Sequence, residues 1–162
     1  MTELTNQLQV TLPPPRCYLA CRHSPQMLQG RLYTADHYWM QPESPGIWRV
    51  GLTPWLIRIL GHIEDFRLDV APGSATSLGQ RLGALEGLHA VVKVRAPMAG
   101  TFLQRNPILG GNLEMISQDG CGTGWLYLIQ GTPDPDACDV TGYRRMLDDA
   151  IDGVCGAGPT LQ

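Results

Sequence analysis

The sequence predicts a mainly β fold: a small β-sandwich or flattened barrel with one short internal helix and a C-terminal helix. Between residues 31 and 131 the apolar segments are short and rich in aromatic or β-branched residues, which is typical of strands. The 19 Gly and 13 Pro are spread along the chain, as many turns would require. The 162 residues suffice for one domain with modest extensions.

Three regions are expected along the chain. Residues 1–30 form an N-terminal extension, because "TLPPPR" cannot enter a central strand or a helix interior: proline lacks the amide donor and fixes φ. Within it, "CYLACRH" can form a short helical turn that places Cys17 and Cys21 on one face. Residues 31–157 form the domain, and residues 158–162 a flexible tail.

The first half of the domain predicts two strands and a helix. "RLYTADHYWM" and "GIWRVGL" are predicted strands, separated by the turn signal "QPESPG". In "TPWLIRILGHI", Thr53 is a candidate N-cap, Pro54 suits the first helical position and Gly61 can end the segment. We therefore expect one short helix there.

The second half predicts more strands and then a helix. "EDFRLDVAP" alternates as a strand, and "GSATSLGQRLGALEG" combines a glycine-punctuated turn with another. "EGLHAVVKVRAP" (86–97) predicts a hairpin with His89 at its turn, followed by strands in "APMAGTFLQRN" and "GWLYLIQG". The segment "DVTGYRRMLDDAIDGVC" predicts an amphipathic helix, since apolar residues recur at helical spacing: Tyr143, Met146, Leu147, Ile151 and Val154.

The charge, the hydropathy and the cysteines of the sequence argue against a nucleic-acid-binding, a membrane-spanning and a disulfide-linked protein. The formal net charge is −3 and the basic residues are scattered, so no nucleic-acid partner is expected. No apolar run reaches membrane-spanning length, and "MTELTNQLQV" lacks the apolar core of a signal peptide. We expect a cytoplasmic protein without a membrane partner. The five cysteines are odd in number and unevenly spaced, which favours reduced thiols over a disulfide framework.

Several motifs in order carry a family resemblance: "YTADHYW" (33–39), "VGLT" (50–53), "LGHI" (60–63), "EGLHAVVKVRAPMAG" (86–100) and "GTGWLYLI" (122–129). With them, residues 31–154 resemble the glycine cleavage system H-protein family of lipoyl-domain carriers. That family typically shows YTxDHEW, VGIT, LGDI, ESVKAxxDxxAPxSG and GxGWLxxI. The resemblance implies a lipoyl/biotinyl-domain-like β-sandwich, a flattened barrel-sandwich hybrid, with a hairpin that displays one lysine.

The resemblance also implies a function. In the family, lipoate is joined to the displayed lysine through an amide, and the swinging dithiolane carries an aminomethyl group between partner enzymes. Glu86, three residues before the hairpin tip, and Gly100, eleven residues after it, match positions that the family uses in modification recognition. The Ala96–Pro97 pair matches as well. The residues around the modified position therefore match the family pattern.

The modified position itself is changed. The family's lysine falls on His89, and an imidazole offers no primary amine for a stable amide. The chain's only lysine, Lys93, lies four residues on, where the family has an aspartate that faces the loaded arm. A shift of four keeps the strand face but moves the amine from the tip into the returning strand. At Tyr38 the family has a glutamate that helps to hold the cationic arm, so a methylamine would meet an ammonium instead of two carboxylates.

Three functions follow, in this order of preference. The first is an H-protein-like, non-catalytic module without lipoate that acts as a docking, regulatory or scaffold protein for a lipoyl-dependent multienzyme system. The second is a lipoyl carrier through Lys93, in glycine cleavage or beside a heterodisulfide-reductase-like sulfur oxidation system. The third is a metal or phosphoryl carrier that uses His89 with His62, which replaces the aspartate of "LGDI". No cofactor is expected unless Lys93 is lipoylated.

The remaining histidines favour simpler interpretations. Scattered histidines without short ligand spacing are a weak metal signal, so we expect His37 to pack against Trp39, His62 to cap a helix end and His89 to be a polar turn residue. The group Cys17, Cys21 and His23 lacks the short spacing and fourth ligand of a structural zinc site.

No residue pattern predicts catalysis. Cys121 lies on a glycine-rich loop, "DGCG", where a thiol can be exposed, but no base is its neighbour in the sequence. The serines and carboxylates show no triad-like motif with a nucleophile elbow, and the glycines of residues 73–83 lack phosphate-loop spacing. We therefore expect a protein that is not an enzyme and holds no metal.

Overall fold

The computed structural model describes residues 30–156, with side chains up to Asp149. The elements follow in this order: β1 (Leu32–Tyr33), β2 (Tyr38–Ser44), β3 (Ile47–Leu52), α3 (Pro54–Leu60), β4 (Ile63–Leu68), β5 (Ala75–Thr76), β6 (Arg81–Gly87), β7 (Val91–Arg95), β8 (Gly100–Arg105), the 3-10 turn η1 (Pro107–Gly110), α4 (Glu114–Gln118), β9 (Tyr127–Gly131) and α5 (Val140–Gly156). The expected extension, with Cys17, Cys21 and His23, and the expected tail lie outside these residues, apart from Gly30.

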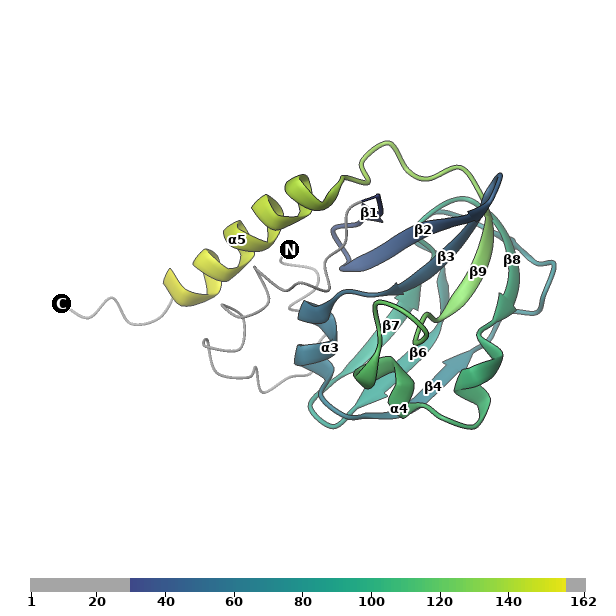
Figure 1. The fold of residues 1–162 in the computed structure, drawn as a ribbon, viewed down its shortest axis with the longest axis horizontal. Helices are drawn as coiled ribbons and strands as arrows, with labels where there is room; N and C mark the ends of the chain where they lie inside the picture. The colour runs from purple at the N-terminus through teal and green to yellow at the C-terminus, as the bar shows by residue number, and fades with distance from the viewer. Residues whose placement is uncertain (1–29, 157–162) are drawn as a thin grey trace.

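The strands form two antiparallel sheets. A six-stranded sheet has the order β1-β2-β3-β9-β8-β5, and a three-stranded sheet has the order β4-β6-β7. Helix α5 starts beside β1 and extends away from the sheets (Figure 1). The predicted β-sandwich with an internal and a C-terminal helix is confirmed. Within residues 30–156 no helix has both the length and the apolar character needed to cross a membrane.

Helix α3 occupies the predicted segment. It begins at Pro54, whose missing amide costs nothing in a first turn, and it ends before Gly61, whose φ is 72°. Thr53 is the N-cap residue as predicted, but its side chain makes no capping bond and instead accepts a hydrogen bond from the Tyr143 hydroxyl at 2.9 Å. A helix of seven residues is not stable alone. Its burial against the sheets holds it in place.

The predicted strand over residues 31–40 is divided in two. A turn separates β1 from β2, and His37 in this turn has a φ of 68°, which a continuous strand cannot contain. The turn is closed because the His37 amide donates to the Thr34 carbonyl at 3.0 Å. The turn predicted from "QPESPG" is shorter than expected, because β2 continues to Ser44 and β3 starts at Ile47.

Two short helical segments were not predicted. The turn η1 starts after Asn106, whose side chain accepts a hydrogen bond from the Ile108 amide at 3.1 Å, and α4 follows it. The Asn106 amide group donates to the carbonyls of Thr123 and Trp125 at 2.9 and 2.8 Å. This buried asparagine organises the long connection from β8 to β9.

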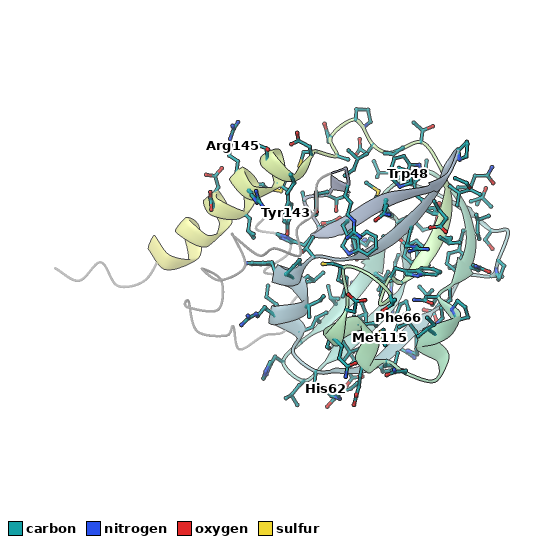
Figure 2. All side chains as sticks on the ribbon, viewed as in Figure 1. Trp48, His62, Phe66, Met115, Tyr143 and Arg145 are labelled. Atoms are coloured by element: carbon teal, nitrogen blue, oxygen red, sulfur yellow. The ribbon has the colours of Figure 1, made fainter. Side chains whose placement is uncertain are left out.

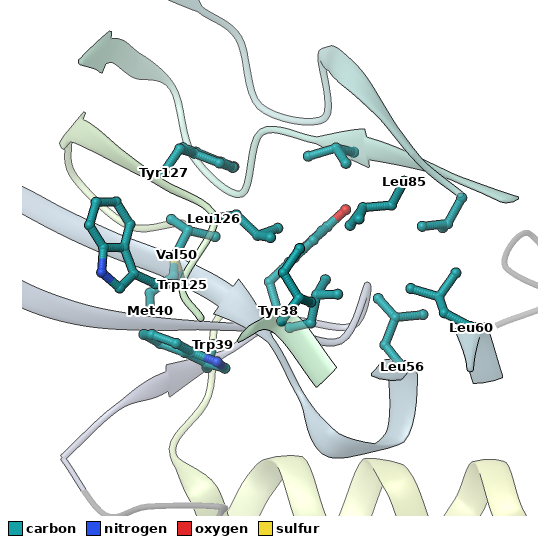
Figure 3. Close-up of a cluster of buried hydrophobic side chains, with 14 of the residues drawn as sticks. Tyr38, Trp39, Met40, Val50, Leu56, Leu60, Leu85, Trp125, Leu126 and Tyr127 are labelled. Atoms are coloured by element: carbon teal, nitrogen blue, oxygen red, sulfur yellow. The ribbon is translucent and has the colours of Figure 1, made fainter. Parts of the chain in front are cut away.

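The core lies between the two sheets, and α3 packs against it. Leu56 and Leu60 of α3 and Leu85 of β6 lie beside Tyr38 of β2 (Figure 3). All four of these side chains are at most 2% exposed. Burying a leucine side chain contributes about 2 kcal/mol, so this cluster contributes much of the stability that joins α3 to the sheets.

Helix α5 is attached through a buried polar network. The Tyr143 hydroxyl lies 2.7 Å from His37 Nδ1 and donates to Thr53 at 2.9 Å, and the Tyr143 ring stacks on Tyr33. Tyr143 projects from α5 towards the sheets (Figure 2). His37 stacks on Trp55 with a centroid distance of 4.3 Å. The expected packing of His37 against Trp39 is therefore wrong, because the positive φ turns the imidazole towards α3.

Several buried side-chain polar atoms have no hydrogen-bond partner among the described residues. The Tyr127 hydroxyl and the Nε2 atom of His37 are two examples in this part of the structure. Burial lowers the pKa of His37 to about 3 and raises that of Tyr127 well above its ordinary value. Both groups are neutral in the folded protein, and each reduces its stability.

Two buried tyrosines should respond in opposite ways to loss of the hydroxyl. We expect Tyr127→Phe to leave the free energy of unfolding unchanged or to raise it by about 1 kcal/mol, because an unpaired hydroxyl is removed. Tyr143→Phe should lower it by about 1–2 kcal/mol, because His37 and Thr53 lose their partner. Urea unfolding of both variants measures the difference. Equal effects would contradict the assigned hydrogen bonds.

His37 should make the protein sensitive to mild acid. Its pKa is about 3 in the folded protein against about 6.5 in the unfolded chain, so the unfolded state takes up a proton first as the pH falls. The free energy of unfolding should therefore drop by about 2 kcal/mol between pH 7 and pH 5 on account of this residue. His37→Asn, which tolerates the positive φ, should lose this pH dependence. Urea unfolding at pH 7 and at pH 5 tests this prediction. The same drop in the free energy of unfolding for the wild type and for His37→Asn would contradict it.

Candidate functional site: the β6–β7 hairpin tip

The predicted hairpin is present, and His89 lies at its tip. Strands β6 and β7 are joined by Leu88 and His89, between Gly87 and Ala90, whose backbones are joined by a 2.8 Å hydrogen bond. The Leu88 side chain is 61% exposed, and His89 is exposed as well. The tip therefore presents one apolar side chain and one imidazole to solvent.

Backbone hydrogen bonds join the hairpin tip to the turn between α3 and β4. The Leu88 amide donates to the His62 carbonyl at 2.8 Å, and the His89 amide donates to the Leu60 carbonyl at 3.0 Å. The His89 ring lies against Gly61: a Cβ at residue 61 would stand 2.5 Å from His89 Cδ2. Because its backbone and its imidazole are both held against one turn, the tip is rigid.

Tyr38 lies in the protein interior, next to strand β7. Strand β7 is an edge strand of the small sheet, with β6 as its neighbour. The Tyr38 hydroxyl donates to the Lys93 carbonyl at 3.4 Å and accepts from the Arg95 amide at 3.2 Å. The residue is 2% exposed, and burial raises the pKa of its phenol. Tyr38 therefore joins the edge of β7 to the large sheet.

The one lysine is on the solvent side of β7. Lys93 is exposed, whereas Val92 and Val94 on either side of it are buried. It stands opposite Ala84 of β6 and four residues beyond His89. Its amine is accessible, but it projects from the middle of a strand instead of from the tip.

Glu86 and Gly100 have different surroundings. Glu86 is exposed on β6, opposite Val91 and close to the tip. Gly100 begins β8 in the other sheet, where a Cβ would overlap the Gln130 carbonyl oxygen. Close strand packing is therefore sufficient to require glycine at this position.

The histidines do not form a metal cluster. Within the described part of the chain, no group of three or more His, Cys, Asp or Glu side chains could hold a metal ion. His62 is exposed and follows Gly61, which ends α3, so the expected helix cap by His62 is wrong in detail. Its carbonyl instead holds the hairpin tip through Leu88.

The environment of Cys121 disfavours the thiolate form that a nucleophile needs. The thiol is buried, and burial raises its pKa to about 11, more than the Arg31 guanidinium lowers it. The expectation of an exposed thiol is wrong because Arg31, stacked on Trp39, covers this loop and donates to the Cys121 carbonyl. No base lies beside the thiol among the contacts of the described residues.

The contacts that hold the hairpin tip in place were not predicted from the sequence. Leu60, Gly61 and His62 hold the tip, and Leu88 is its most exposed apolar side chain. An apolar residue in a two-residue hairpin loop was a readable signal, because glycine, asparagine and aspartate are favoured there. The contact with the α3–β4 turn joins segments far apart in the sequence and left no local signal.

The sandwich and its rigid exposed hairpin define a lipoyl-domain type of fold, the class used by swinging-arm carriers. A family model described as glycine cleavage H-protein matches residues 31–140. The glycine cleavage system H protein of Mycobacterium tuberculosis is 31% identical over 120 residues, covering 74% of this chain and 86% of that protein. The protein of the same name from Alteromonas mediterranea is also 31% identical, covering 72% and 92%.

A solved structure supports the same assignment. The crystal structure of a glycine cleavage system H protein from Mycobacterium marinum superposes with a TM-score of 0.62 at 28% identity, covering 80% of this chain and 98% of that one. The chain therefore belongs to the glycine cleavage H-protein family. The family is of lipoyl-carrier type, and the hairpin tip of this chain presents the imidazole of His89.

Loss of the Tyr38 hydroxyl should loosen the edge of β7. We expect Tyr38→Phe to lower the free energy of unfolding by about 1 kcal/mol and to speed exchange of the Arg95 amide hydrogen, because both hydrogen bonds to the strand edge are lost. Hydrogen exchange followed by NMR measures this. Tyr127→Phe is the control, since its hydroxyl has no partner in the structure, and it should leave the Arg95 amide unchanged. Unaltered exchange in Tyr38→Phe would rule out the proposed role of the phenol.

Proposed function

We propose that this protein is a non-catalytic H-protein-like module that carries no lipoate and acts by docking in a lipoyl-dependent multienzyme system. The observation that carries the proposal is the imidazole of His89 at the exposed tip of an otherwise intact hairpin. An amide bond to lipoate needs a primary amine at that point. The residue present does not fit the prosthetic group.

The geometry of the tip favours docking. Leu88 and Val91 are 61% and 48% exposed, and the backbone of the tip is fixed by the α3–β4 turn. A rigid apolar projection loses little conformational entropy when a partner covers it. An exposed leucine on the turn and an exposed valine at the start of β7 therefore favour contact with another protein over a loop that contacts only solvent.

A second candidate is a carrier that is lipoylated on Lys93. The exposed amine of this residue favours it, and because Lys93 is the only lysine, any acyl group on a side-chain amine must be there. Its position within a strand argues against it. The arm would start from the sheet surface, where neighbouring strands limit its sweep.

A gain-of-function experiment distinguishes the two candidates. The chain is co-expressed with a lipoate–protein ligase and lipoate, and its intact mass is measured. We expect no lipoyl group on the wild-type chain and one on His89→Lys, because the frame is otherwise complete. Leu88→Lys is the matched control, since it places an amine one residue away on the same tip. A lipoyl group on the wild-type chain that Lys93→Arg abolishes would establish the second candidate.

Docking is measured separately. Purified glycine cleavage enzymes are immobilised one at a time, and binding of the unlipoylated wild-type chain is followed by biolayer interferometry. Leu88→Glu should weaken binding at least tenfold, whereas Ile108→Glu should not. Ile108 is a matched control because it is 47% exposed on η1. Equal binding by both variants, or no binding by the wild-type chain to any of these enzymes, would contradict docking through the tip.

A further inference from the structure

Three basic side chains lie together on the outer face of the small sheet. Arg81 of β6 and Lys93 of β7 are exposed, and Arg95 of β7 is partly buried. The alternation along β7 places Lys93 and Arg95 on the face opposite the buried Val92 and Val94. We call Arg81, Lys93 and Arg95 the basic patch.

The strand register brings these charges close together. Arg81 is paired with Arg95 across the two strands, beside the register irregularity between Arg81 and Gly83, and Lys93 is paired with Ala84. Directly opposed residues have Cβ atoms about 5 Å apart, and residues two apart on a strand are separated by about 7 Å. The small Ala84 side chain leaves the Lys93 side chain unshielded on its β6 side.

The basic patch is not neutralised within the described residues. Arg81 Nε donates to the Gly83 carbonyl at 3.4 Å and Arg95 donates to the Gly79 carbonyl at 3.1 Å, but neither arginine has a carboxylate at ion-pair distance. The Arg95 Nε atom is buried without a partner. In the part of the chain that the structure describes, no hydrogen bond or ion pair involves the Lys93 ammonium.

Stability does not account for this arrangement. Like charges placed directly opposite one another in a sheet are destabilising, as Arg81 and Arg95 are here. Asp65 of β4 is 3.6 Å from Arg67, and Glu86 lies towards the hairpin tip. Asp69 follows β4 and its amide donates to the Leu82 carbonyl next to Arg81, but within the described residues it forms no ion pair with Arg81. The three cations form an unfavourable cluster that an external anion would relieve.

We infer that the basic patch binds an acidic segment of a protein partner. This rests on the proposed function, because it specifies the chemistry of the partner on which the module docks. The patch belongs to the same hairpin as Leu88, so one partner surface can cover both. Electrostatic attraction to the patch would speed the encounter and orient the tip.

The chemistry of the face favours an acidic protein over other anions. The outward residues of β4, β6 and β7 form an exposed sheet surface, whereas small-molecule sites are concave. The outward positions of these three strands carry no aromatic side chain on which a base could stack.

The test uses a fluorescein-labelled oligo-glutamate peptide and the full-length protein, followed by fluorescence anisotropy. We expect salt-sensitive binding that weakens at least tenfold in the double variant Arg81→Glu/Lys93→Glu. The matched control is Arg58→Glu/Arg145→Glu, which reverses two exposed cations on α3 and α5 and should bind as the wild type does. Equal loss in both double variants would show general charge attraction only and would overturn the inference, as would tighter binding of a single-stranded oligonucleotide.

Thermal unfolding supplies an independent readout. Arg81→Glu should raise the melting temperature, because it turns a repulsive cross-strand pair into an attractive one, while it weakens peptide binding. A lower melting temperature would mean that the cations support the fold, and the inference would fail. The peptide-binding and thermal measurements change Arg81 and Lys93 and leave Leu88 and His89 intact. Their outcome is therefore independent of the intact-mass measurement of lipoylation and of the binding measurement with Leu88→Glu.

Discussion

The structure of the site depends on the attachment of the hairpin tip to the turn after α3. Two backbone hydrogen bonds, from Leu88 to His62 and from His89 to Leu60, join segments that are more than twenty residues apart. They require close approach, and Gly87 allows it, because a Cβ there would overlap the Leu60 carbonyl oxygen. Without this contact, residue 89 would lie on a free two-residue loop. With it, the tip has one position relative to the sandwich, whatever side chain it carries.

The second constraint is the edge of β7. An unpaired strand edge is a site for unwanted pairing with other chains, and here a buried phenol occupies two of its backbone groups, at Lys93 and Arg95. Tyr38 belongs to β2 of the large sheet, so these two hydrogen bonds join the small sheet to the large sheet.

The sequence was sufficient for the features that depend on local chemistry. Pro54 and Gly61 bounded α3, and alternation located most strands, because each leaves a signal within a few residues. The break at His37 was not predictable, since its positive φ is stabilised by tertiary contacts with Trp55 and Tyr143. Likewise, the chemistry of residue 89 was readable, whereas its attachment to the α3–β4 turn and the pairing of Arg81 with Arg95 needed the register of the sheets.

The glycines that surround the hairpin tip are weak evidence that the protein is modified there. Gly100 begins β8 where only glycine fits against the Gln130 carbonyl, and Gly61 has a positive φ and lies under the tip residue. Packing alone would keep both residues whether or not the protein carries an arm. Residues that packing does not require are a better record of function, and these are the exposed ones: Leu88, His89 and Lys93. All three favour a surface that contacts another protein: an apolar projection, an imidazole without an acyl-accepting amine, and a cation in an unneutralised cluster.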